Sequence, residues 1–125
     1  MCRILVADDD AEQLVLWKTV LESGGHEVRV ALCVAGTLQQ LAAHGADLIM
    51  MDLRFPNAAG DADAAEGRAL IRGIRECGCA APVIVMSGWP EALEGQPEEG
   101  LVSRVMVKPV RVAALLAAIQ ELVAG

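Results

Sequence analysis

Five short apolar runs, separated by stretches with helical periodicity, form the hydrophobic pattern of this chain. Each run is five to seven residues long and most are rich in Val, Ile, Leu or Met, which favours β-strands. The fourth run, PVIVMS, has the most continuous series of β-branched residues, and this is typical of a strand buried on both faces of a parallel sheet. We therefore predict five strands, at residues 2–7, 27–31, 47–53, 82–87 and 103–107.

Between these runs, apolar side chains recur every three or four residues, which predicts amphipathic helices. The first helix is expected at residues 11–23, where Leu14, Trp17 and Leu21 share one face and a Gly-Gly pair follows the last turn. We expect Trp17 to pack in the core. The same criterion predicts three further helices, at residues 36–43, 66–76 and 112–122.

Two stretches interrupt the regular alternation of strands and helices. Residues 54–65 are rich in Asn, Ala, Gly and Asp, and we predict a long irregular loop there. Residues 88–100 occupy the place of one more helix. Proline and glycine disfavour the helix interior, so we expect this fourth helix to be short or distorted by four residues of these types, Pro90, Gly95, Pro97 and Gly100.

Strands that alternate with helices predict an α/β fold with a parallel sheet covered on both faces. The length of 125 residues matches a single domain over residues 1–125 and leaves no room for a separate output module. In open sheets of this kind, binding sites lie beyond the carboxyl ends of the strands, where the strand order reverses. The candidate chemistry should therefore be sought at the strand ends.

Composition and charge exclude several classes of function. The chain is 54% apolar and 22% charged, as expected of a folded domain, and its net charge of −7 without a basic patch argues against direct binding to nucleic acids or anionic membranes. The start, MCRILVADDD, has acids where a signal peptide is apolar, and no apolar run approaches the ~20 residues of a membrane span. The four cysteines lack the spacing of a zinc site. We expect a cytoplasmic protein with reduced thiols.

Polar side chains end four of the five predicted strands. Asp8 and Asp9 follow the first strand, Asp52 ends the third, Ser87 the fourth, and Lys108 follows the fifth. Three carboxylates brought together need a compensating cation, and oxygen ligands without His or Cys favour Mg²⁺. A carboxylate beside Mg²⁺ can act as a nucleophile on a phosphoryl group while an ammonium group and a hydroxyl hold its oxygens. Asp52, Lys108 and Ser87 suit these three roles.

Simpler explanations exist for some of these residues. The three consecutive acids at residues 8–10 could only cap the following helix, Ser87 could belong to a turn, and Lys108 could end a strand in solvent. Asp52 is harder to explain in this way, because an unpaired carboxylate within an apolar run is costly to bury. His26 and His44 lie beside glycines near helix ends, and we expect both at the surface, outside the mechanism.

Four short motifs, each at the end of a predicted strand, carry a family resemblance. ILVADDD, MMDLRFP, VIVMSGWP and VMVKP occur in this order and resemble the receiver domain of two-component response regulators over essentially the whole chain. The resemblance implies a flavodoxin-like, doubly wound sheet of five parallel strands in the order 2-1-3-4-5. It also implies a signalling domain rather than an enzyme. Asp52 would take a phosphoryl group from a histidine kinase or a histidine phosphotransfer protein, and the resulting change of conformation would control an output domain or an effector protein.

The same resemblance assigns a metal site by position. Asp9 would bind Mg²⁺ directly and Asp8 would bind it through water. Asp52 and the backbone carbonyl of Arg54 would complete the protein ligands, whereas Asp10 matches no ligand.

The resemblance also assigns the residues that would contact the phosphoryl group. Lys108 would pair with it, and Ser87 would move inward to hydrogen-bond it. Lys108-Pro109 resembles the cis peptide of the family, which the following proline makes accessible. Trp89 lies two residues past Ser87, where side chains of the family overhang the site. We hypothesise that its ring hinders the water that would attack phosphorylated Asp52.

Two departures from the family pattern concern signalling. Val105 stands three positions before the lysine, where the family has an aromatic residue that moves together with the hydroxyl side chain. The loop after Asp52 is longer than usual, so that the acid and glycine of the family correspond to Glu66 and Gly67, displaced by extra residues within 57–65. We expect this extended loop to be solvated.

Two other functions are compatible with the sequence. A degenerate receiver would keep the fold and signal by protein contact without phosphorylation, and Val105 favours this alternative. Asp8-x-Asp10 also resembles the nucleophile motif of haloacid dehalogenase phosphatases. However, Glu12 stands where that motif has Thr or Val, and a late acidic pair is missing. Neither GxGxxG nor a P-loop occurs after the first strand.

Overall fold

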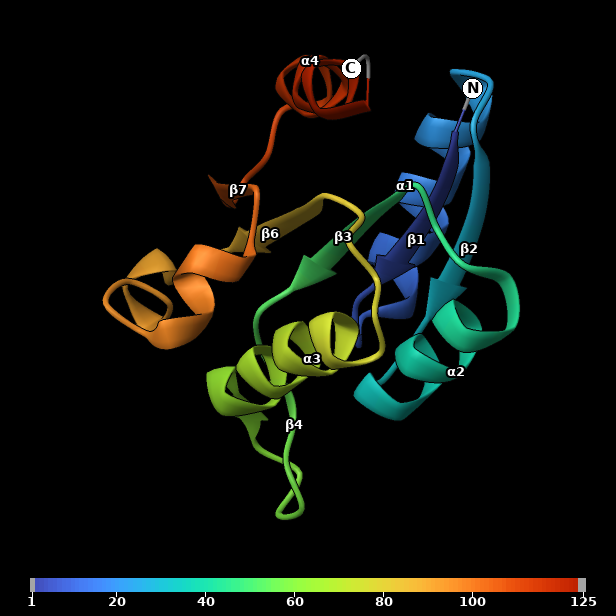
Figure 1. The fold of residues 1–125 in the computed structure, drawn as a ribbon. Helices are drawn as coiled ribbons and strands as arrows, with labels where there is room; N and C mark the ends of the chain where they lie inside the picture. The colour runs from blue at the N-terminus through green and yellow to red at the C-terminus, as the bar shows by residue number, and fades with distance from the viewer. Residues whose placement is uncertain (1, 124–125) are drawn as a thin grey trace.

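A computed structural model describes residues 2–123, which build a five-stranded parallel sheet between two layers of helices (Figure 1). The sheet has the spatial order β2-β1-β3-β6-β7, and each neighbouring pair is parallel. Counted along the chain, this is the predicted order 2-1-3-4-5. All five strands lie within one residue of their predicted limits: β1 (Arg3–Ala7), β2 (Glu27–Ala31), β3 (Leu48–Asp52), β6 (Val83–Ser87) and β7 (Arg104–Val107).

Each face of the sheet has its own apolar core. On one face, α1 (Ala11–Ser23) and α4 (Val112–Val123) pack through side chains that include Leu14 and Leu115. On the other face, α2 (Val34–His44) and α3 (Ala64–Glu76) lie side by side (Figure 1). Trp17 is 6% exposed in the first core, as predicted. The central strands are buried from both sides, which explains their continuous apolar sequences.

Residues 54–65 differ from the irregular loop that the sequence predicts. A short antiparallel hairpin forms, in which β4 (Phe55–Pro56) pairs with β5 (Ala62–Asp63), and α3 begins directly afterwards. The side chain of Asn57 explains the difference. Its Oδ1 accepts hydrogen bonds from the amides of Ala59 and Asp61, and its Nδ2 donates to Asp63. Asparagine therefore closes the turn with its own side chain.

The segment between β6 and β7 contains no α-helix in the described chain. Two short 3₁₀ helices, η1 (Pro90–Ala92) and η2 (Pro97–Leu101), each begin at a proline, and Gly95 between them has a positive φ of 76°. The prediction of a short or distorted fourth helix is confirmed. Leu93, 1% exposed, anchors the segment in the second core.

The start of α3 lies against the chain that follows β3. A Cβ atom on Gly67 would lie 1.8 Å from the carbonyl oxygen of Leu53, so a side chain at this position would push the helix away. This contact gives a physical reason for glycine in the displaced Glu66-Gly67 pair. Because α3 packs directly on the backbone of Leu53, a movement of the loop next to Asp52 would also displace the start of this helix.

The surface prediction is right for one histidine and wrong for the other. His44 is exposed, but His26 is half-buried, and its Nδ1 accepts a hydrogen bond of 3.2 Å from the amide of Cys2. The starts of β1 and β2 adjoin, so this contact lies at the end of the sheet. Across residues 2–123, no helix has both the length and the apolar character needed to cross a membrane.

Candidate functional site

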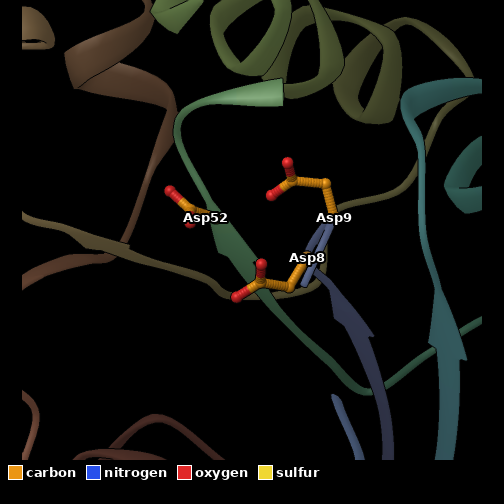
Figure 2. Close-up of side chains that lie close together, drawn as sticks. All are labelled: Asp8, Asp9 and Asp52. Carbon is orange, nitrogen blue, oxygen red and sulfur yellow. The ribbon is translucent and has the colours of Figure 1, made fainter. Parts of the chain in front are cut away.

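Three carboxylates and one ammonium group meet at the carboxyl edge of the sheet. Asp8 and Asp9 follow β1 and Asp52 ends β3, and the register of these strands pairs Ala7 with Met51. Each acid offers a carboxylate oxygen, and the three oxygens lie within 4.8 Å of one another (Figure 2). Lys108 Nζ lies 2.8 Å from Asp52 Oδ2 and 3.8 Å from Asp8 Oδ2. Four residues chosen from the sequence therefore converge.

Asp8 is the most deeply buried member of this cluster, at 1% exposure. Its Oδ1 accepts a hydrogen bond of 3.0 Å from the amide of Asp10, whereas its Oδ2 has no hydrogen-bond partner among the described residues. Burial raises the pKa of Asp8 to about 6; the amide of Asp10 and the charge of Lys108 oppose the rise, and Asp52 and Asp9 add to it. A buried carboxylate oxygen without a donor is a position that a cation would satisfy.

The donor set fits a hard divalent cation. The oxygens come from carboxylates alone, and no His or Cys belongs to the cluster within the described chain. Mg²⁺ prefers oxygen ligands and retains several waters, so it suits a site in which Asp8 is buried and Asp9 is exposed. Asp9 and the half-buried Asp52 both line a cavity at this edge of the sheet.

Asp10 has a different role from its two neighbours. Its carboxylate caps α1 by accepting hydrogen bonds from the amides of Glu12 and Gln13. The helix-cap explanation therefore holds for Asp10 and not for Asp8 or Asp9.

The raised pKa of Asp8 predicts how the metal-free protein responds to pH. The folded form holds its proton up to about pH 6, whereas an unfolded aspartate loses it near 3.8. The stabilising contribution of this proton is therefore complete below pH 3.8 and is lost as the pH rises to about 6. A pKa shift of about two units corresponds to a stabilisation of the folded protein by roughly 3 kcal/mol as an upper limit. Asp8→Asn should raise the free energy of unfolding at about pH 7.5 by roughly 1–2 kcal/mol.

Urea unfolding in EDTA measures this effect at about pH 4.5 and about pH 7.5. The gain from Asp8→Asn should shrink at the lower pH, because the wild-type carboxyl is already neutral there. Asp10→Asn removes the same charge from an exposed cap and is the matched control. Equal gains in the two variants at both pH values would contradict the account of Asp8.

Asp52 faces a cavity of about 330 Å³ with both oxygens engaged. Oδ1 accepts a hydrogen bond of 3.1 Å from the amide of Arg54, and Oδ2 accepts one of 2.8 Å from Lys108. The side chain is 15% exposed, so a group entering the cavity can reach it. Seven residues line the cavity: Asp9, Asp52, Arg54, Ala62, Gly88, Trp89 and Lys108.

Ser87 lies at the end of β6 but does not line this cavity. It is 1% exposed, and its Oγ accepts a hydrogen bond of 2.9 Å from the amide of Trp89. Its carbonyl accepts the amide of Lys108 at 2.9 Å, which aligns the ends of β6 and β7. The peptide between Lys108 and Pro109 is cis, as the resemblance implied.

Arg54 and Trp89 form a stacked pair above the cavity. The guanidinium carbon lies 4.8 Å from the centre of the indole ring, a cation–π distance, and Nη2 donates to the carbonyl of Ala62 on the hairpin. The family resemblance placed Trp89 over the site, but it gave no sign that its ring touches the side chain of Arg54. The β4–β5 hairpin, which the sequence pattern does not predict, holds the Arg54 side chain in this position.

Sequence comparisons identify what the chain resembles. Residues 4–120 match the family model for the response regulator receiver domain. The tetrathionate response regulatory protein TtrR of Salmonella typhimurium is 29% identical over 124 residues, which cover 97% of this chain and 56% of the relative. The chain thus spans little more than half the length of that relative.

Solved structures share the fold. TrrA from Thermotoga maritima, in complex with Mg(2+)-BeF, has a TM-score of 0.83 at 22% identity, with 98% of this chain and 99% of that chain covered. A Francisella response regulator receiver domain has a TM-score of 0.79 at 25% identity, covering 99% and 98%. NtrX from Brucella abortus reaches 0.83 at 22% identity, covering 98% of this chain and 27% of that chain.

Proposed function

The chain belongs to the response regulator receiver family of two-component systems, and from this premise we propose that Asp52 accepts a phosphoryl group from a histidine kinase or a histidine phosphotransfer protein. Residues 1–125 would act as a single receiver domain that controls an output domain or an effector protein. The convergence of Asp8, Asp9, Asp52 and Lys108 carries the proposal. The transfer would take place in the cytoplasm, because the kinase needs ATP.

The chemistry needs a nucleophile and a cation, and two residues suit these roles. An oxygen of ionised Asp52 would attack the phosphorus of the donor while the bond to the histidine nitrogen breaks. The electron pair of that bond stays on the imidazole, and an acyl phosphate forms on Asp52. Lys108, already 2.8 Å from Asp52 Oδ2, would stabilise the charge on the phosphoryl oxygens. Ser87 would move inward and its hydroxyl would donate a hydrogen bond to one of these oxygens.

We propose Mg²⁺ as the cofactor. Asp9 would bind it directly and Asp8 through water, with Asp52 and the backbone carbonyl of Arg54 as the other protein ligands. Bound Mg²⁺ supplies positive charge to the transferring phosphoryl group. The unpartnered Oδ2 of Asp8 supports this assignment, because it lacks a donor in the described protein.

Intact mass after incubation with acetyl phosphate tests the proposal. We expect an increment of one phosphoryl group with Mg²⁺ and none with EDTA. If neither acetyl phosphate nor any histidine kinase adds a phosphoryl group, the proposal fails. The protein would then be a degenerate receiver that acts through contact, an alternative that Val105 in the aromatic position favours.

A groove beside Lys108 is suited to docking the phosphoryl donor. It has a volume of about 590 Å³ and lies between α1 and the start of α4. A kinase must bring its phosphohistidine to Asp52, so a contact surface that shares Lys108 with the site meets the geometric requirement. Its apolar lining comes from Leu16, Trp17, Met86, Pro109, Val110 and Val112.

Leu16→Glu is expected to reduce phosphotransfer from the kinase by at least roughly tenfold, because a buried charge would disfavour the docked complex. Phosphorylation by acetyl phosphate should not change, since Leu16 lies outside the phosphoryl cavity. Val15→Glu is the control: Val15 is 67% exposed on the same helix and does not line the groove. The measurement is the initial rate of phosphotransfer from a kinase that phosphorylates the wild type. An equal loss of rate in Leu16→Glu and Val15→Glu would argue against docking in the groove.

Trp89→Ala is expected to shorten the lifetime of phosphorylated Asp52 roughly fivefold, because removal of the ring opens the cavity to water. Trp89→Phe keeps a ring to stack on Arg54 and should retain most of the lifetime. Both rates can be followed by the decay of the phosphorylated mass after removal of the donor. A lifetime that is unchanged in Trp89→Ala would refute the shielding hypothesis.

A further inference from the structure

Arginines on one flank of α3 hold the segment between β6 and β7. Arg68, Arg72 and Arg75 are spaced by four and three residues, which places them on one face of the helix. Arg68 Nη1 donates to the carbonyl of Ala92 at 2.9 Å. Arg75 donates to the carbonyl of Leu101 from Nε at 3.1 Å and from Nη2 at 2.7 Å. Both ends of residues 90–101 are therefore attached to α3 through arginine side chains.

Glu98 lies at the centre of this arrangement. It is 5% exposed, and Asp8 is the only other acidic residue of the described chain with comparable burial. Its Oε2 lies 2.9 Å from Arg72 Nη1 and its Oε1 lies 3.7 Å from Arg68 Nε. A buried carboxylate remains charged at tolerable cost only when it is paired, so Glu98 requires both arginines.

The segment has little else to hold it. Leu93 is its one buried apolar side chain among the described residues, and most of the other residues of the segment are exposed. The backbone hydrogen bonds of its 3₁₀ turns are local to the segment and do not attach it to α3, and Gly95 and the prolines prevent a longer helix. A segment with few apolar contacts opens at low free energy, so the ion pairs decide how firmly it is closed.

A continuous series of contacts joins Glu98 to Asp52. The amide of Arg54 donates to Asp52, and the guanidinium of Arg54 stacks on Trp89. The carbonyl of Trp89 accepts the amide of Ala92, and the carbonyl of Ala92 accepts Arg68, which also lies beside Glu98. Trp89 is therefore linked to α3 through η1.

We propose that Arg68, Arg72 and Glu98 form a clamp that couples occupancy of the Asp52 site to the closure of residues 90–101 on α3. This inference rests on the proposed function, because the occupant is the phosphoryl group. A phosphoryl group on Asp52 takes up space beside Arg54 and Trp89 and draws on Lys108, which shifts the loop that carries η1. Coupling between two sites is reciprocal, so occupancy of the site and closure of the clamp affect each other by the same factor. A variant that loosens the clamp therefore changes the affinity of the site by at most that factor.

Glu98→Gln tests the clamp with almost no change of shape, and Glu94→Gln is the matched control. Glu94 is an exposed acid of the same segment, without a side-chain partner among the described residues. Hydrogen exchange on the full chain should be at least roughly tenfold faster within residues 90–101 of Glu98→Gln. Exchange in β1 and β3 should be unchanged, and Glu94→Gln should resemble the wild type.

The second readout is the affinity for Mg²⁺ with beryllofluoride, a phosphoryl analogue. We expect roughly a fivefold change of Kd in Glu98→Gln and none in Glu94→Gln. Arg72→Gln should reproduce the effect of Glu98→Gln, and Arg72→Lys, which keeps the cation, should restore most of the wild-type value. A purely structural role for Arg72 would not distinguish these two variants.

The outcomes separate the parts of the inference. Unchanged exchange in Glu98→Gln overturns the clamp. Faster exchange with a Kd equal to that of Glu94→Gln overturns the coupling. If wild-type protein takes up neither beryllofluoride nor a phosphoryl group while Glu98→Gln still loosens the segment, the proposed function and the coupling both fail. The clamp then stands as a structural feature.

Discussion

Replacement of Asp52 by Asn is expected to abolish phosphorylation. The amide has nearly the shape of the carboxylate and can still accept the amide hydrogen of Arg54, but it lacks the negative charge and the nucleophilic oxygen. Removal of a nucleophile leaves no alternative route to the acyl phosphate, so we expect a loss of more than roughly 10³-fold. Intact mass after incubation with acetyl phosphate and Mg²⁺ measures the change.

Asp61→Asn is the control for Asp52→Asn. Asp61 is exposed at the tip of the β4–β5 hairpin, outside the carboxylate cluster. Its substitution removes the same charge and should leave phosphorylation intact. Thermal unfolding of both variants verifies that they are folded. If Asp52→Asn is phosphorylated as fast as Asp61→Asn, the assignment of the acceptor is wrong.

Lys108→Gln is expected to slow phosphorylation by roughly 10²-fold, since it removes a preorganised cation from the position where charge develops. Lys108 is the one cation within 4 Å of the carboxylates among residues 2–123. The same change should strengthen Mg²⁺ binding, because the ammonium group no longer competes for Asp52 and Asp8. An unfolded variant would lose both phosphorylation and Mg²⁺ binding, so slower phosphorylation together with tighter Mg²⁺ binding indicates a direct role of Lys108.

Lys108→Arg keeps the charge and should retain more of the rate than Lys108→Gln. Lys18→Gln, an exposed lysine of α1, controls for a general change of net charge. Phosphorylation rates and Mg²⁺ titrations of the variants give the two readouts. A weaker affinity for Mg²⁺ in Lys108→Gln would show that Lys108 organises the carboxylates rather than competing for them.

The sequence was informative about the sheet and the strand ends for a physical reason. Strands buried on both faces must be apolar throughout, so an acid such as Asp52 at the end of β3 stands out. The fold then brings strand ends together at one edge, so residues that end different strands, such as Asp8, Asp52 and Lys108, become neighbours. Pattern and topology suffice to predict that convergence.

The hydrophobic pattern does not predict contacts between side chains that are far apart in the sequence. The stacking of Arg54 on Trp89 requires the β4–β5 hairpin, which depends on hydrogen bonds of the Asn57 side chain. Glu98 pairs with Arg72, 26 residues away, across a segment without helical periodicity. The spacing of the arginines on α3 was the available signal, but an exposed row of arginines is equally compatible with a solvated helix face.

We propose that Asp52 alone among the clustered acids receives the phosphoryl group. Reduction of the phosphorylated protein with borohydride converts an aspartyl phosphate to homoserine, and peptide sequencing by mass spectrometry then locates it. We expect homoserine at position 52 and aspartate at positions 8 and 9. Homoserine at position 8 or 9, or a phosphoryl group on Ser87 with Asp52 unmodified, would contradict it.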